Sequence, residues 1–211
     1  MVSDRLTVRL LLPALFLAFA VTAGAQTGAA AADTTVAASD FVAGLADKTV
    51  TAMTEPGIDK DERRRRFRGL MLDNFAFSGI AKWVLGRYWN RASESERTEY
   101  LKLFEDLMVV IYADRFAKYS GEKLEVGKAE LRGENDILVH SQLTRPAGLE
   151  PVDVIWRIRK LDGQFKIVDL MVEGLSMGLT QQKEFASVIR QNGGQVQSLL
   201  DELKKRIAAN S

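Results

Sequence analysis

Residues 152–176 read VDVIWRIRKLDGQFKIVDLMVEGLS, and this stretch decides the fold. It predicts two antiparallel strands joined at Asp162-Gly163, because a two-residue type I′ turn needs positive φ at both central residues and favours this dipeptide. A turn at this position places Leu161 opposite Gln164 and fixes the register of the pair. Four further cross-strand pairs follow from that register: Ile158 with Ile167, Trp156 with Asp169, Ile155 with Leu170, and Val154 with Met171.

The two faces of this hairpin differ in character, because alternate residues of a strand point to opposite sides of a sheet. One face carries the apolar residues Val152, Val154, Trp156, Ile158, Phe165, Ile167 and Met171. The other face is charged near the turn and apolar at the far end, where it carries Ile155, Val168, Leu170 and Val172. We interpret the first face as the wall of a core or of a cavity, and we expect the far end of the hairpin to be covered on both sides.

The first 25 residues have the three parts of a secretory signal. Two arginines precede an apolar run at residues 10–21, and small residues at 23–25 form a cleavage site. The alternative is an uncleaved anchor, but the apolar run is short for a bilayer span. We therefore expect residues 1–25 to be removed on export.

The charge and the cysteine content exclude several classes of function. The 211-residue chain has a formal net charge of +1, and Asp4, Arg5 and Arg9 give the leader a net +1, so the remainder is formally neutral. A neutral chain argues against a nucleic-acid-binding protein, which needs a net basic surface. The chain has 0 cysteines, which excludes disulfides, a thiol nucleophile and thiolate metal sites, and we expect no cofactor.

The rest of the chain predicts helices on both sides of a group of strands. Residues 26–39 are rich in Ala and Thr without periodicity, so we expect a flexible tether there, followed by one domain at residues 40–208. Helices are expected from Ser39, from Asp59 with Glu62 as a capping-box partner, at residues 78–85, and from Ser93 to about Tyr119, with the last one central. Strands are expected at 123–131 and 137–144, and further helices at 180–191 and from 196 onward. This order predicts an α+β fold in which several helices pack on a curved four-stranded antiparallel sheet.

Catalytic and metal-binding motifs are missing from the sequence. There is no GxSxG, no glycine-rich phosphate loop and no HExxH, and we interpret the single histidine, His140, as a strand side chain. Asp169 has two interpretations, since the predicted register places this carboxylate on the apolar face. It is either a proton-transferring base in a pocket, or a structural group bonded to backbone atoms or an arginine at the edge of the sheet. We favour the second, because no partner acid or histidine can be named.

Arg63, Arg64, Arg65 and Arg66 form a run near the start of the second helix. Four consecutive residues point in different directions around a helix, so a solvated face is one interpretation. The other is a contact surface for an acidic partner or for anionic lipid headgroups.

Several separate segments carry a resemblance to a known family. They are VLGRYW at 84–89, Ala92-Ser93 with Arg97 and Phe104, residues 152–160, Val168-Asp169, VEGLS at 172–176, and Phe185 with RQNG at 190–193. In this order, over about residues 41–207, the chain resembles the MlaC or toluene-tolerance family of periplasmic phospholipid-binding proteins of the Mla lipid transport pathway.

The resemblance implies a periplasmic carrier, not an enzyme, that holds phospholipid acyl chains in an apolar cavity between the sheet and the helices. Its partners would be an inner-membrane ABC transporter with an MCE-domain protein and an outer-membrane lipoprotein and porin complex, and its role would be to maintain outer-membrane lipid asymmetry. Candidate lipid-binding residues are Phe104, Met108, Ile111, Val154, Trp156, Ile158, Ile167 and Met171. The arginine run at 63–66 would contact a partner or a headgroup. Three alternatives stay open: a hopanoid-associated branch of the same family, a small-pocket enzyme using Asp169, and an adaptor or chaperone without a ligand whose arginine run at 63–66 docks a partner.

Overall fold

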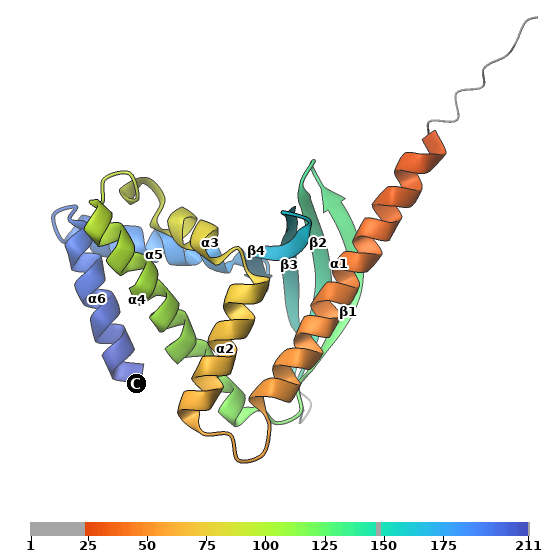
Figure 1. Ribbon diagram of the computed structural model, residues 1–211, viewed down its shortest axis with the longest axis horizontal. Coiled ribbons are helices and arrows are strands. Elements are labelled where there is room, and N and C mark those ends of the chain that lie inside the picture. The colour runs from red at the N-terminus through yellow and green to blue at the C-terminus, as the bar shows by residue number, and fades with distance from the viewer. Residues whose placement is uncertain (1–23, 147–148, 211) are drawn as a thin grey trace, which may run out of the picture.

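The computed structural model describes residues 24–146 and 149–210, so the leader expected at 1–25 lies almost entirely outside the described residues. Before the sheet come α1 (Gly24–Met53), α2 (Lys60–Asn74), α3 (Phe77–Leu85) and α4 (Glu94–Tyr112), with short 3-10 helices η1 (Gly86–Tyr88) and η2 (Ala113–Lys118). The sheet contains β1 (Lys123–Arg132), β2 (Asp136–Thr144), β3 (Val152–Leu161), β4 (Gln164–Val172) and β5 (Leu175–Ser176). Its strands are antiparallel and follow one another in chain order, and α5 (Met177–Gln191) and α6 (Val196–Asn210) complete the α+β fold (Figure 1). The fifth strand is the two-residue β5, which the sequence analysis did not predict.

The helix starts follow the capping signals in the sequence. Ser93 caps α4 through a reciprocal pair of bonds, in which the Glu96 amide donates to Ser93 Oγ at 3.2 Å and the Ser93 amide donates to Glu96 Oε2 at 2.8 Å. Asp59 caps α2 by accepting a bond from the Glu62 amide at 2.7 Å. The predicted return bond from the Glu62 side chain is replaced by ion pairs to Arg65 and Arg66, described below.

Helix α1 begins earlier than the sequence suggests. The predicted start at Ser39 is wrong, because Ser39 lies inside a helix that begins at Gly24 and includes the residues expected to form a tether. Ala38 and Val42 are fully buried against the sheet. Alanine has the highest intrinsic helix propensity, and a short alanine side chain leaves no strong hydrophobic period to detect. Packing on the sheet therefore extends the helix toward its N-terminus.

The β3–β4 hairpin has the predicted turn but a different register beyond it. Asp162 and Gly163 have positive φ of 50° and 79°, and Leu161 pairs with Gln164 as expected. The pair Ile158 with Ile167 is also confirmed, but a β-bulge at Val168 then shifts the register by one residue. The three other predicted pairs are wrong, and the observed ones are Arg157 with Asp169, Trp156 with Leu170, Ile155 with Met171, and Val154 with Val172.

The bulge changes which residues share the apolar face. Leu170 joins Trp156 and Ile158 in the cluster between α1 and the sheet, whereas Met171 pairs with Ile155 on the other face. An extra residue in one strand reverses the alternation beyond it. Ile155 and Met171 remain apolar and half-buried on the second face, and α5 packs against β4, so the expectation of cover on both sides at the far end of the hairpin is not contradicted.

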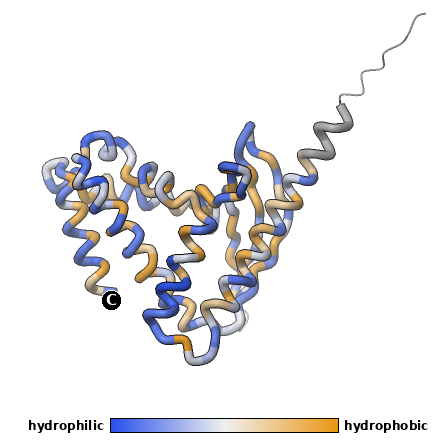
Figure 2. The backbone as a smooth tube through the Cα atoms, in the orientation of Figure 1, coloured by the Kyte–Doolittle hydropathy of each residue, from blue (hydrophilic) through white to orange (hydrophobic). Residues whose placement is uncertain are grey.

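The hydrophobic core is divided between two bodies. We call α1 with the strands the sheet body, and α3 to α6 the helical body; Figure 2 shows apolar residues recurring along the helices and strands of both. Helix α2 lies between them, and Leu70 and Phe75 at its end pack against both clusters. The amide of Ala76 also donates to the carbonyl of Ile167 at 2.9 Å, which attaches this segment to the edge of β4.

The centre of the helical body is aromatic. Tyr100 is fully buried and donates its hydroxyl to the carbonyl of Ala81 at 2.9 Å, and burial raises the pKa of Tyr100. Phe104 stacks on Tyr100, and the ring of Phe185 from α5 lies edge-on to Phe104 at 6.1 Å between centroids. Helix α4 is therefore the central helix, as predicted.

Candidate functional site

The eight candidate lipid-binding residues belong to different parts of the structure. Trp156, Ile158 and Ile167 lie in the sheet cluster, and the two isoleucines are fully buried. Phe104, Met108 and Ile111 belong to the helical cluster. Val154 lies on the apolar face of the sheet with Trp156, but the bulge places Met171 on the opposite face. The structure thus places seven of the candidates in two groups, one on each body, and Met171 apart from both.

Trp156 supplies a polar group on the apolar face of the sheet. Its Nε1 donates to Ser141 Oγ at 2.9 Å, and the same hydroxyl donates to the carbonyl of Val154 at 3.0 Å. Ser141 is buried, and these bonds satisfy its hydroxyl. The indole is half-buried, so it is fixed by a hydrogen bond while part of its surface stays accessible.

The residues at the junction of the two bodies were only partly found by sequence reasoning. Leu70 and Phe75 contact both bodies, and nothing in the sequence showed this. Leu170 was assigned to the wrong face because a bulge has no distinctive sequence signal here. An open hollow of about 500 Å³ between α1 and α2 includes Leu70 but none of the eight candidates, and is lined by Asp47, Lys48, Thr51, Ala52, Glu55 and Leu70.

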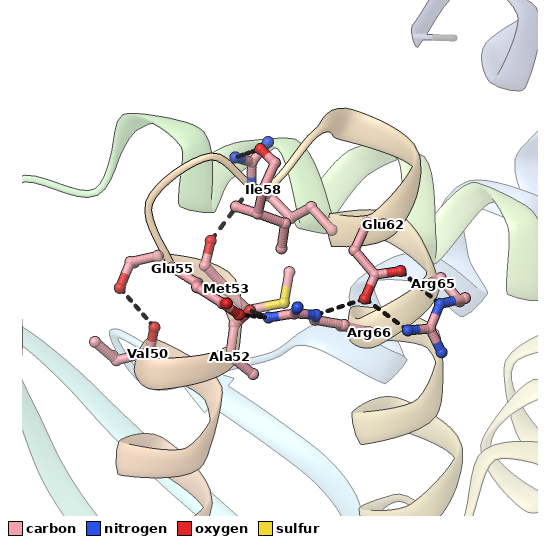
Figure 3. Close-up of polar contacts among 10 residues, drawn as sticks. Val50, Ala52, Met53, Glu55, Ile58, Glu62, Arg65 and Arg66 are labelled. Atoms are coloured by element: carbon pink, nitrogen blue, oxygen red, sulfur yellow. Dashed lines mark hydrogen bonds and ion pairs between the residues drawn. The ribbon is translucent and has the colours of Figure 1, made fainter.

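Two arginines of the run bind the C-terminal end of α1. Arg66 donates to the carbonyl of Ala52 at 2.9 Å and forms an ion pair with Glu55, and Figure 3 shows these contacts. Arg63 donates to the carbonyl of Met53 at 3.3 Å and to that of Ile58 at 3.1 Å. The last carbonyls of a helix lack partners within the helix, so these guanidinium groups satisfy α1 from a neighbouring helix.

The other two arginines have different partners. Arg64 donates to Asp114 Oδ2 of η2 at 2.9 Å and to the carbonyl of Asn210 at 2.7 Å, which links α2 to the end of α6. Arg65 pairs with Glu62 of its own helix, and its side chain is 73% exposed. Hydrogen bonds from Arg65 and Arg66 lower the pKa of Glu62 from 4.5 to about 2. We call Arg63, Arg64 and Arg66 the arginine clamp, because each is bonded to a segment outside its own helix.

The structure supports the structural interpretation of Asp169. The carboxylate accepts bonds from the Leu170 amide at 2.9 Å, the Gly178 amide at 3.1 Å and the Ser176 hydroxyl at 2.6 Å. It is 8% exposed and lies where β4 meets the start of α5. The prediction that Asp169 lies opposite Trp156 is wrong, since it pairs with Arg157, but the predicted bonding to backbone groups is confirmed.

His140 lies in β2, as expected, with Nε2 at 3.5 Å from Glu130 Oε1. Among the residues that the structure describes, no group of three or more side chains is arranged to hold a metal ion. Within the same residues, no helix is long and apolar enough to cross a membrane.

Asp136, the first residue of β2, accepts hydrogen bonds from two arginines of the neighbouring strand β3. Arg157 Nε lies at 2.7 Å from Asp136 Oδ2, and Arg159 Nε at 2.5 Å from Oδ1. Burial acts to raise the pKa of Asp136, but hydrogen bonds from Arg159 and then Arg157 outweigh it and lower the pKa.

Fold and site together define a mixed helix and antiparallel-sheet domain with a divided apolar core. The sequence model of the MlaC protein family matches residues 44–205, which is most of the chain. The chain belongs to the MlaC family, whose members are lipid-binding transport proteins and not enzymes.

Two relatives illustrate the similarity. The intermembrane phospholipid transport system binding protein MlaC of Haemophilus influenzae is 25% identical over 113 residues, which is 52% of this chain and 53% of that protein. The aligned part thus spans about half the length of the relative. The structure of a phospholipid-binding protein from Ralstonia solanacearum in complex with a phospholipid has a TM-score of 0.71 and 21% identity, and the match covers 80% of this chain and 95% of that one. At that identity the second match shows a shared fold.

Proposed function

We propose that this protein is a periplasmic carrier that binds phospholipid by its acyl chains and carries it between the two membranes. The observation that carries the proposal is the family match across residues 44–205. It is supported by a fold shared with a protein whose structure holds a phospholipid. The segment at 1–25 would direct export and be cleaved.

The divided core suggests where the acyl chains bind. The described apolar residues form two separate clusters instead of one closed core. The half-buried side chains of Leu70 and Phe75 pack against both clusters. We place the acyl chains at this junction, with Trp156 and Leu170 on the sheet side and Met108 and Ile111 on the helical side. Each buried methylene contributes about 0.8 kcal/mol, so binding is tight and release needs a partner that separates the bodies.

The proposed partners lie in both membranes. In the inner membrane the carrier would exchange lipid with an ABC transporter bearing an MCE-domain protein. In the outer membrane it would exchange lipid with a lipoprotein and porin complex, which would maintain the lipid asymmetry of that membrane. The arginine run is a weaker candidate for partner contact than the sequence suggests, because three of its four members are bonded to segments outside their own helix.

Mass spectrometry of the molecules released by organic solvent from natively purified protein tests the proposal. We expect phospholipid in an amount close to one molecule per protein. A hopanoid or other polycyclic lipid would keep the carrier mechanism and change the cargo. Protein that is empty when prepared from its exporting host would overturn the proposal.

A further inference from the structure

Three exposed apolar side chains come from segments that meet where α3 packs on the start of α5. They are Trp83 near the end of α3, Leu175 in β5 and Leu179 in the first turn of α5, with exposed fractions of 38%, 64% and 40%. Large apolar side chains that are exposed singly need no explanation, but three from different elements at one place do. We call these three residues the apolar tip.

Close packing of α3 on α5 holds the tip together (Figure 1). A Cβ atom added at Gly178 would lie 2.0 Å from Cζ3 of Trp83, so the indole rests directly on the backbone of α5. Gln182 Nε2 also donates to the carbonyl of Trp83 at 2.6 Å. Leu179 follows Gly178 directly in the chain, and Leu175 precedes Gly178 by three residues. The fold therefore holds this surface in place without a bound partner.

Three cations surround the tip. Lys82 precedes Trp83, and Lys183 lies one turn after Leu179 on the same side of α5. Arg87 follows Gly86, where an added Cβ atom would lie 3.2 Å from Gln182 Nε2 of α5. All three are exposed, and none of them forms an ion pair with any residue that the structure describes. Lys82 and Arg87 instead lie over the rings of Trp89 and Tyr88, at 5.7 and 5.1 Å from the ring centroids.

This distribution of charge contrasts with that of the arginine clamp. Arg63, Arg64 and Arg66 are satisfied by carboxylates and helix carbonyls. Among the described residues, the three cations of the tip pair with no carboxylate, although Lys82 and Arg87 contact aromatic rings and Arg87 also donates to the hydroxyl of Tyr88. The nearest acid on α5, Glu184, pairs with Arg206 instead of Lys183. The charge at the tip is therefore available to an anionic surface.

We propose that the apolar tip docks the protein on an anionic bilayer surface, with Trp83, Leu175 and Leu179 entering the headgroup region and the three cations meeting lipid phosphates. Tryptophan and leucine with adjacent lysine and arginine are typical of interfacial membrane contact. A protein interface is a poorer fit, because lysine is depleted from such interfaces. The inference goes beyond the carrier function, since it gives the protein direct contact with lipid bilayers in addition to membrane complexes.

Co-sedimentation of the exported form of the protein with vesicles tests this. We expect binding to vesicles that contain phosphatidylglycerol, weaker binding to phosphatidylcholine alone, and a decrease as salt rises. The double variant Leu179→Asp with Lys183→Glu should bind the anionic vesicles at least about tenfold more weakly.

A matched control exists at the turn of the hairpin. Leu161 is 40% exposed, as Leu179 is, and Lys160 is exposed beside it. Leu161→Asp with Lys160→Glu should therefore leave vesicle binding unchanged. Equal losses in the two double variants, or no binding of the unaltered protein to anionic vesicles, would overturn the proposal and direct attention to an acidic protein partner. The lipid content of each purified variant is measured in parallel, because a full lipid load without vesicle binding would leave the carrier function intact.

Discussion

At the scale of single residues, Asp169 shows how a buried carboxylate can be entirely structural. Its two oxygens accept bonds from two backbone amides and from the hydroxyl of Ser176. That hydroxyl in turn accepts the amide of Leu179 as the N-cap of α5. One carboxylate thus fixes the end of β4, the β5 strand and the first turn of α5, and the negative charge also suits a helix N-terminus.

Asp169→Asn should destabilise the fold without changing what the protein binds. The amide keeps one acceptor but turns an NH₂ group toward donors, so we expect a loss of about 1–3 kcal/mol in the free energy of unfolding in urea. Asp47→Asn on the exposed side of α1 is the control and should change it by less than about 0.5 kcal/mol. Loss of a catalytic turnover in Asp169→Asn, with stability unchanged, would restore the enzyme interpretation.

Asp136 predicts how stability depends on acid. Its pKa is lowered from 3.8 because the hydrogen bonds from Arg159 and Arg157 outweigh burial. A carboxylate with a lowered folded-state pKa contributes stability above its unfolded pKa, and this contribution disappears as the pH falls through the folded pKa. Asp136→Asn should therefore be less stable than the unaltered protein at about pH 7, and the difference should shrink below about pH 4. Urea unfolding across this pH range measures it, and a difference independent of pH would contradict the assignment.

At the scale of elements, the arginine clamp explains how α1 is attached to the rest of the chain. Carbonyl groups at the C-terminal end of α1 accept hydrogen bonds from arginines of α2. The carbonyl of Asn210 at the end of α6 accepts a hydrogen bond from Arg64, which also belongs to α2. Through Arg63, Arg64 and Arg66, the short α2 helix is bonded to α1, η2 and α6.

Arg66→Ala and Arg65→Ala form a matched pair at adjacent positions. Arg66 has a 27% exposed side chain and bonds α1, whereas Arg65 is 73% exposed and pairs within its own helix. We expect Arg66→Ala to lower the free energy of unfolding in urea and Arg65→Ala to leave it almost unchanged, because Arg66 bonds α1 and Arg65 does not. The change in helix propensity is the same in both, so equal losses would mean that the bonds to α1 do not contribute.

Prediction from the sequence succeeded where the signal is local. The capping box at Ser93 and the turn at Asp162-Gly163 each depend on neighbouring residues, and both are confirmed. The bulge at Val168 could not be predicted, because the apolar residues of β4 fit an alternating pattern in either register. The partners of Arg64 are 50 and 146 residues away, so the role of the arginine run also depends on tertiary structure. The assignment of the lipid-binding residues stays a prediction.

At the scale of the whole molecule, the proposed carrier depends on the junction between two bodies. Among the candidate lipid-binding residues of the sheet body, a substitution can affect either folding or lipid binding, depending on how deeply the residue is buried. Ile158 is fully buried beneath α1, so a charged residue there would unfold the sheet body. Trp156 is half-buried and is the informative position.

Trp156→Ala should lower the amount of bound lipid while the domain still folds. The loss of the indole removes apolar wall and leaves the buried Ser141 hydroxyl with one bond fewer. Phe41→Ala is the control, because Phe41 packs on Phe165 in the same cluster and tests general loosening of the sheet body. Lipid phosphate per folded protein measures the effect, and equal lipid content in all three proteins would place the binding site elsewhere.

The helical body also has a consequence for the order in which the protein can fold. Its helices come from both sides of the sheet in the sequence, since Tyr100 and Phe104 of α4 are covered by Phe185 of α5. Each strand pairs with its neighbour in the chain, so short loops are enough to form the sheet. Helix α4 instead packs against α5, which follows the whole sheet in the sequence. During synthesis, the aromatic surface of α4 stays uncovered until the last helices emerge. A chain that lacks its final helices would keep its sheet and expose the centre of its helical body, which makes such fragments prone to aggregate.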